Sequence, residues 1–202
     1  MNPDLDRPAV LFDLDGTLID LRELHFRALN LALYEAGYAT VTLEQHAAID
    51  GLPTTVKLER LGIPDQIRPV VNSLKQQHTR NLLKESCAPN DRLNNELERI
   101  GREFFIGVVS NALNETCAAA LMMSGIAPYV KLLIAGPHSR PKPDPEPYVK
   151  AIEAAHLRPD KTVAVEDNHF GAEAAQRAGL RCLRVESPAD VTYELVTSGF
   201  EK

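Results

Sequence analysis

Carboxylate, hydroxyl and ammonium side chains follow short apolar runs at four places in this sequence. The first place is Asp13-Leu14-Asp15-Gly16-Thr17, in which two carboxylates stand at positions i and i+2. In an extended segment this spacing puts both side chains on the same side, and Gly16 permits a sharp turn after them. The other three places are Ser110-Asn111, Arg140-Pro141-Lys142-Pro143 and Glu166-Asp167. Acid, hydroxyl, ammonium and acid groups are therefore available for the chemistry of an anionic ligand.

The elements that must position these groups alternate between apolar runs and helical patterns. Strands are predicted at 9–13, 104–110, 130–136, 162–167 and 180–185, and helices between them at 90–101, 114–125, 145–156 and 168–179. Asn90 and Asn168 are predicted helix N-caps, and Gly101, Gly125 and Gly179 are predicted C-terminal stops. Continuous apolar strands separated by helices indicate a doubly wound α/β fold with a parallel sheet.

The region between the first and second strands breaks this alternation. Helical patterns follow one another at 21–37, 42–49, 55–62 and 65–85, without a strand between them. Such a block predicts a helical unit inserted after the first strand. The expected domains are an α/β core at 1–19 and 89–202, and the inserted unit at 20–88.

Ligands of open α/β sheets bind outside the carboxyl ends of the strands, where the four polar segments are expected. Four acidic side chains at this edge, from Asp13, Asp15, Glu166 and Asp167, would repel one another without a compensating charge. A hard divalent cation with oxygen ligands, such as Mg²⁺, resolves this repulsion. The cation and Lys142 could then neutralise a phosphate dianion, so that one carboxylate attacks phosphorus and a second transfers protons.

These segments, in this order and after these strands, resemble the motifs of the haloacid dehalogenase superfamily over nearly the whole chain. The resemblance implies that Asp13 is the nucleophile and Asp15 the general acid and base. It implies that Ser110 binds phosphoryl oxygens and that Lys142 orients both nucleophile and phosphate. Asp167 would hold Mg²⁺ together with Asp13 and the Asp15 carbonyl, with Glu166 assisting. The inserted helices at 20–88 resemble the cap of that family.

The resemblance to the superfamily does not by itself indicate which of its reactions this protein catalyses. Asp15 favours phosphoryl transfer over dehalogenation, because a leaving oxygen must be protonated. A phosphatase acting on a sugar phosphate or nucleoside monophosphate is the main expectation, and a sugar-phosphate mutase of the beta-phosphoglucomutase type is the alternative. The segment Gly51-Leu52-Pro53-Thr54 lacks the arginine expected in a mutase for a second phosphate. A binding protein without turnover is the third hypothesis.

Substrate contacts are expected from both parts of the chain. In the core they are Thr17 and Asn111, and in the cap His25, Thr54 and Arg80. Lys57 and Lys75 could serve a Schiff-base reaction, but each is interpreted as a surface lysine. The cap region has few aromatic residues, so the sequence does not indicate a surface on which a nucleobase would stack.

Composition narrows the classes of partner. The net charge of −6 argues against nucleic-acid binding through a basic surface. The polar start MNPDLDRP lacks the pattern of a secretory signal, and three scattered cysteines indicate reduced thiols. We therefore expect a cytoplasmic monomer that acts on a small phosphorylated metabolite, not on nucleic acid or a membrane.

Overall fold

The computed structural model describes residues 7–136 and 139–201 of the chain. Contacts within the chain divide it into two compact units, Met1–Asp20 with Ala88–Lys202, and Leu21–Cys87. Among the described residues, no helix combines the length and the apolar character needed to cross a bilayer.

The first unit is built on a five-stranded parallel sheet. The strands are β1 (Ala9–Phe12), β2 (Phe105–Leu113), β3 (Leu132–Gly136), β4 (Thr162–Glu166) and β5 (Arg181–Arg184). Their order in the sheet is β3-β2-β1-β4-β5, and every neighbouring pair is parallel. The predicted doubly wound α/β fold is thus confirmed.

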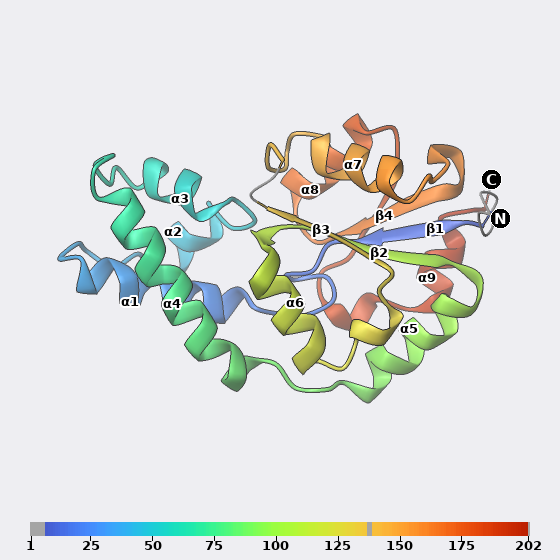
Figure 1. Cartoon of the computed structure of the whole chain (residues 1–202), viewed down its shortest axis with the longest axis horizontal. Coiled ribbons are helices and arrows are strands. Elements are labelled where there is room, and N and C mark those ends of the chain that lie inside the picture. The colour runs from blue at the N-terminus through green and yellow to red at the C-terminus, as the bar shows by residue number, and fades with distance from the viewer. Residues whose placement is uncertain (1–6, 137–138, 202) are drawn as a thin grey trace. The chain divides into compact units, whose positions relative to one another are not determined.

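Helices cover both faces of this sheet (Figure 1). They are α5 (Asp91–Glu103), α6 (Asn114–Met123), α7 (Glu146–Ala154), α8 (His169–Arg177) and α9 (Tyr193–Ser198). Figure 1 shows α7 and α8 on one face and α5, α6 and α9 on the other. Three 3-10 turns lie between the elements, η1 (Ala127–Tyr129), η2 (Pro159–Lys161) and η3 (Pro188–Asp190).

The central strand β1 lies at the point where the chain reverses its direction across the sheet. The chain passes from β1 outward through β2 to β3, and then returns to β4 on the other side of β1. All four residues of β1 are fully buried, which fits a strand covered on both faces. The carboxyl end of β1 is therefore the switch point at which open α/β sheets bind their ligands.

Most of the predicted helix ends are confirmed, with one exception. Asn90 and Asn168 cap α5 and α8, and their side chains accept from Leu93 N and Gly171 N. The predicted stop at Gly101 is wrong, because α5 continues to Glu103 and the amide of Phe104 still bonds Ile100 O.

Strand β2 also runs three residues past its predicted end. It reaches Leu113 through a register shift against β3 that begins after Ser110. Such a bulge changes the direction of the strand and of the side chains that follow it.

The second unit consists of helices only. They are α1 (Arg22–Glu35), α2 (Leu43–Ala47), α3 (Thr54–Arg60) and α4 (Arg68–Ser86). Helices α1 and α4 pack against each other, and α3 also contacts α4. Apolar residues such as Leu24, Leu29 and Val71 are buried. Thr42 and Gln45 form a capping box at the start of α2.

Candidate active site

The polar segments predicted from the sequence meet at the carboxyl edge of the sheet. Asp13 follows β1 directly, and its amide still bonds Val165 O of β4 at 2.9 Å. Glu166 is the last residue of β4, and Ser110 lies in β2. The side chains of Asp13 and Glu166 are almost completely shielded from solvent, with 6% and 0% exposed. Buried carboxylates require charged or hydrogen-bonding partners.

Lys142 is the partner that both carboxylates share. Its Nζ lies 2.6 Å from Asp13 Oδ1, 2.6 Å from Glu166 Oε1 and 2.7 Å from the carbonyl oxygen of Val109. An ammonium group has three N–H donors, so these three acceptors account for all of them. Burial alone would lower the pKa of Lys142, but the two carboxylates raise it above its ordinary value. Lys142 therefore stays charged beside Asp13, with all three of its donors satisfied.

The loop that carries Lys142 is fixed by Asn111. The Asn111 side chain accepts from the Lys142 amide at 2.9 Å and donates to the Lys142 carbonyl at 3.2 Å. This paired contact clamps the peptide of Lys142 to the end of β2. Asn111 was expected to bind substrate, whereas the structure shows its amide holding the backbone of the loop.

Glu166 is held by two donors on one oxygen. Its Oε1 accepts from Lys142 and from the hydroxyl of Tyr148 on α7, the latter at 2.5 Å. Burial raises the pKa of Glu166 to about 8, Lys142 opposes this rise and the negative charge of Asp13 adds to it. Burial likewise raises the pKa of Asp13, against the attraction of Lys142. One ammonium is thus shared by two buried carboxyl groups, and burial raises the pKa of both.

Asp167 adds a third acidic group to this cluster. Oxygen atoms from Asp13, Glu166 and Asp167 lie within 4.8 Å of one another, an arrangement that could hold a metal ion. Three hard oxygen donors suit Mg²⁺. The carboxylate of Asp15 is not in this group. The donor set of the described residues therefore fits the expected magnesium ion.

The turn after Asp15 determines how close the Asp167 carboxylate can come to the loop that follows β1. Gly16 has φ of +89°, a conformation that L side chains rarely adopt. A Cβ atom at position 16 would lie 2.0 Å from Asp167 Oδ2. The chain forms a tight loop at this point, in which the amide of Gly16 donates to the carbonyl oxygen of Ile19 at 2.8 Å. Glycine is therefore required here by both the backbone angle and the neighbouring carboxylate.

The hydroxyl groups predicted in the site are both buried. Ser110 Oγ accepts from the amide of Ala112 at 3.1 Å, and the buried thiol of Cys117 on α6 is its neighbour. Burial raises the pKa of Cys117 to about 12, so it stays a neutral thiol. Thr17 is fully buried, and its Oγ1 has no hydrogen-bond partner in the described part of the chain. Thr17 is predicted to contact substrate, but its hydroxyl is not exposed in the structure.

The comparisons with known proteins identify the family of this chain. The family described as haloacid dehalogenase-like hydrolase matches residues 10–185, which include all four motifs. The chain belongs to this family. The resemblance inferred from the sequence is thereby confirmed.

Two curated relatives of this hydrolase are phosphatases by name. The phosphorylated carbohydrates phosphatase of Thermotoga maritima is 28% identical over 178 residues, covering 85% of this chain and 82% of the relative. The phosphoglycolate phosphatase of Aquifex aeolicus is 29% identical over 175 residues, covering 86% and 82%. Together with the family, they confirm the expected enzyme class, a phosphatase.

A solved structure shows the same fold. The beta-phosphoglucomutase of Clostridium difficile superposes with a TM-score of 0.81 at 18% identity, over 96% of this chain and 97% of that one. At this identity the likeness concerns the fold alone.

The helical unit of the hydrolase contains the other predicted substrate residues. His25 is buried, and its Nδ1 lies 3.2 Å from Lys75 Nζ. Thr54 begins α3 and accepts from Gln76 at 3.4 Å, whereas Arg80 is exposed on α4. The structure brings His25 into a buried polar cluster and leaves Arg80 on the surface.

The interpretation of Lys57 and Lys75 as surface lysines is wrong. Their exposed fractions are 6% and 8%, and Lys57 Nζ lies 3.3 Å from Asp50 Oδ1. Buried His46 is the neighbour that the sequence did not single out. Burial, and then the charge of Lys57, lower the pKa of His46 to about 4. This unit thus contains a buried basic cluster, defined by His25, His46, Lys57 and Lys75.

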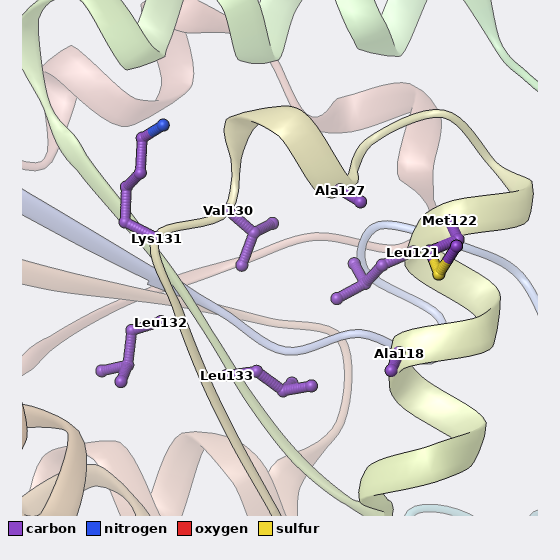
Figure 2. Close-up of a pocket in the computed structure, with 8 residues that line it drawn as sticks. All are labelled: Ala118, Leu121, Met122, Ala127, Val130, Lys131, Leu132 and Leu133. Atoms are coloured by element: carbon purple, nitrogen blue, oxygen red, sulfur yellow. The ribbon is translucent and has the colours of Figure 1, made fainter.

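A separate hollow lies on the edge of the sheet away from the carboxylates. A pocket of about 220 Å³ lies between α6 and the start of β3, and Figure 2 shows the side chains that line it. It is lined by Ala118, Leu121, Met122, Ala127, Val130, Lys131, Leu132 and Leu133. Because its β3 residues begin the strand and the acidic cluster lies at the opposite ends of the strands, this apolar pocket is not part of the candidate active site.

Proposed function

We propose that this phosphatase is magnesium-dependent and hydrolyses a small phosphate monoester through an aspartyl-phosphate on Asp13. The observation that carries the proposal is the 2.6 Å contact between Lys142 Nζ and Asp13 Oδ1 at the switch point of the sheet. A buried lysine that fixes a buried aspartate can orient it for attack. The same ammonium can balance the charge of an incoming phosphate.

The proposed reaction has two steps. In the first, a carboxylate oxygen of Asp13 attacks phosphorus while Asp15 donates a proton to the leaving oxygen. In the second, Asp15 takes a proton from a water molecule, which attacks phosphorus, frees Asp13 and releases inorganic phosphate. Asp15 is half-buried, whereas Asp13 is buried, and this difference suits the residue that must exchange protons with solvent.

The charges around Asp13 support its role. Asp13, Glu166 and Asp167 would hold Mg²⁺, with the carbonyl of Asp15. When bound, the ion supplies positive charge to the phosphoryl oxygens during the transfer. Lys142 orients Asp13 through its 2.6 Å contact, and Ser110 is proposed to bind a phosphoryl oxygen.

The substrate is proposed to be a sugar phosphate or a nucleoside monophosphate. We propose that the helical unit Leu21–Cys87 acts as the cap and that His25, Thr54 and Arg80 contact the substrate there. The buried basic cluster adds Lys57 and His46 to the residues that should be varied. We further propose that the enzyme is a cytoplasmic monomer.

The test is phosphate release from a panel of phosphorylated metabolites, with and without Mg²⁺, with Asp13→Asn as the blank. Magnesium-dependent release that disappears in this variant supports the proposal, and the best substrate names the physiological class. Turnover that requires a bisphosphate activator and releases little phosphate would instead establish the mutase. The absence of any turnover by folded protein would favour a binding role.

A further inference from the structure

Tyr148 connects helix α7 to the charged groups beneath Asp13. Its side chain is fully buried, and its hydroxyl donates to Glu166 Oε1 at 2.5 Å. Lys142 Nζ lies 5.1 Å from the centre of the Tyr148 ring, within the range of a cation–π interaction. One tyrosine therefore contacts both charged partners of the nucleophile's cluster through two different parts of its side chain.

The hydroxyl of Tyr148 competes with Lys142 for a single oxygen atom. Glu166 Oε1 accepts from both donors, while Glu166 Oε2 has no hydrogen-bond partner among the described residues. Without the hydroxyl, Lys142 would be the only hydrogen-bond donor left to this buried carboxyl group among the described residues. Glu166 would then attract the ammonium more strongly, at the expense of the contact between Lys142 and Asp13.

Glu166 itself has little freedom to move away. A Cβ atom on Gly171 would lie 2.0 Å from Glu166 Oε2, so the carboxylate is packed directly on the backbone of α8. Because Glu166 is confined on that side, a change in its hydrogen bonds must be taken up by Lys142. The position of Lys142 in turn sets the orientation of Asp13.

We propose that Tyr148 is a positioning residue for phosphoryl transfer, which acts through Glu166 to keep Lys142 on Asp13. The inference rests on the proposed function, because it gives Asp13 the role of nucleophile. Tyr148 does not touch the reacting atoms. Its effect should appear in the chemical step rather than in the binding of substrate.

Tyr148→Phe removes the hydroxyl and keeps the ring. The expected result is a fall in kcat of about tenfold, typical of losing one hydrogen bond to a charged group, with KM changed less than threefold. Kinetics should be measured with p-nitrophenyl phosphate at saturating Mg²⁺ and corrected for the folded fraction. An unchanged kcat in an active enzyme would overturn the inference.

Tyr193→Phe is the matched control. The hydroxyl of Tyr193 also donates to a glutamate, Glu103, at 2.8 Å, and Arg99 lies 4.0 Å from the centre of its ring. The control therefore loses the same kind of bond beside the same kind of cation, but on the surface between α5 and α9. It should keep the kcat of the wild type, and an equal loss in both variants would assign the effect to stability.

A double-variant cycle tests whether Tyr148 acts through Glu166. In a Glu166→Gln background the added Tyr148→Phe change should lower kcat less than twofold, because the buried charge that the hydroxyl compensates is gone. Equal effects of Tyr148→Phe in both backgrounds would contradict the proposed route.

The inference can fail separately from the proposed function. If the wild type hydrolyses no phosphate ester, the urea midpoints of Tyr148→Phe, Lys142→Met and the double variant still report on the coupling. Midpoint shifts that do not add support a connection between Tyr148 and Lys142. Additive shifts would overturn the positioning role regardless of activity.

Discussion

Gly16 lies directly against the carboxylate of Asp167, and no side chain fits between them. A Cβ atom at position 16 would stand 2.0 Å from Asp167 Oδ2. The two residues belong to separate motifs, one after β1 and one after β4, and these strands are neighbours in the sheet. The contact therefore sets how the loop of Asp13 and Asp15 meets the acid proposed to bind the metal.

Gly16→Ala should abolish most of the activity, because the methyl group must displace the Asp167 carboxylate. We expect kcat to fall at least 100-fold and the Mg²⁺ concentration for half-maximal activity to rise. Gly179→Ala is the control, because Gly179 also has a positive φ of +82° but a Cβ atom added there would meet nothing within 4 Å. It should lower stability by about 1 kcal/mol and leave kcat unchanged. Equal kinetics in both variants would refute the steric argument.

Asn111→Ala should reduce kcat about tenfold by releasing the loop of Lys142. Both hydrogen bonds of the clamp disappear, while the Lys142 side chain and its acceptors remain. Steady-state kinetics and urea unfolding would measure the two effects separately. In Asn90→Ala, which removes the N-cap of α5, stability should fall by about 1 kcal/mol without a change in kcat. If the two asparagine variants behave alike, the clamp has no role in positioning Lys142.

The fold and the motifs of the core could be predicted because each motif directly follows its strand in the sequence. Asp13 after β1 and Glu166 at the end of β4 must share an edge once both strands are parallel. Tyr148 could not be found in this way. A tyrosine on the buried face of an amphipathic helix has the pattern of a core residue, and its partner Glu166 lies on another element.

The helical unit shows why charge alone is a poor guide to exposure. Neither Lys57 nor Lys75 stands in a recognisable motif, and the sequence therefore favours a surface position for each. The structure supplies local partners, Asp50 for Lys57 and His25 for Lys75, and these contacts depend on how four helices pack. No pattern within a single helix contains that information.

Magnesium should stabilise the protein against heat, because the proposed metal site exists only in the folded state. At a concentration 100 times the dissociation constant, the gain is about 2.7 kcal/mol in the free energy of unfolding. Asp167→Asn should remove most of this gain, as measured by thermal unfolding with and without Mg²⁺. Asp160→Asn, which changes an exposed aspartate paired with Arg158, should keep it. A wild type whose midpoint does not respond to Mg²⁺ would argue against the proposed metal site.

His46 should make the protein lose stability as the pH falls below about 6.5. Its pKa in the folded state is about 4, lowered by burial and by Lys57, whereas the ordinary value is 6.5. Between these two pH values His46 is protonated in the unfolded chain but not in the folded chain. The contribution of His46 to the free energy of unfolding therefore decreases as the pH falls. The effect is complete near pH 4 and amounts to about 3 kcal/mol at most.

Glu166, whose pKa is raised to about 8, also takes up a proton on folding in the range from pH 6.5 to 5, so only a comparison between variants isolates the contribution of His46. His46→Gln cannot take up the proton at position 46. The urea midpoint of the wild type should therefore fall relative to that of His46→Gln across this range. If the two proteins lose stability in parallel, His46 is not the group responsible, and its burial in the basic cluster does not control the pH response of the helical unit.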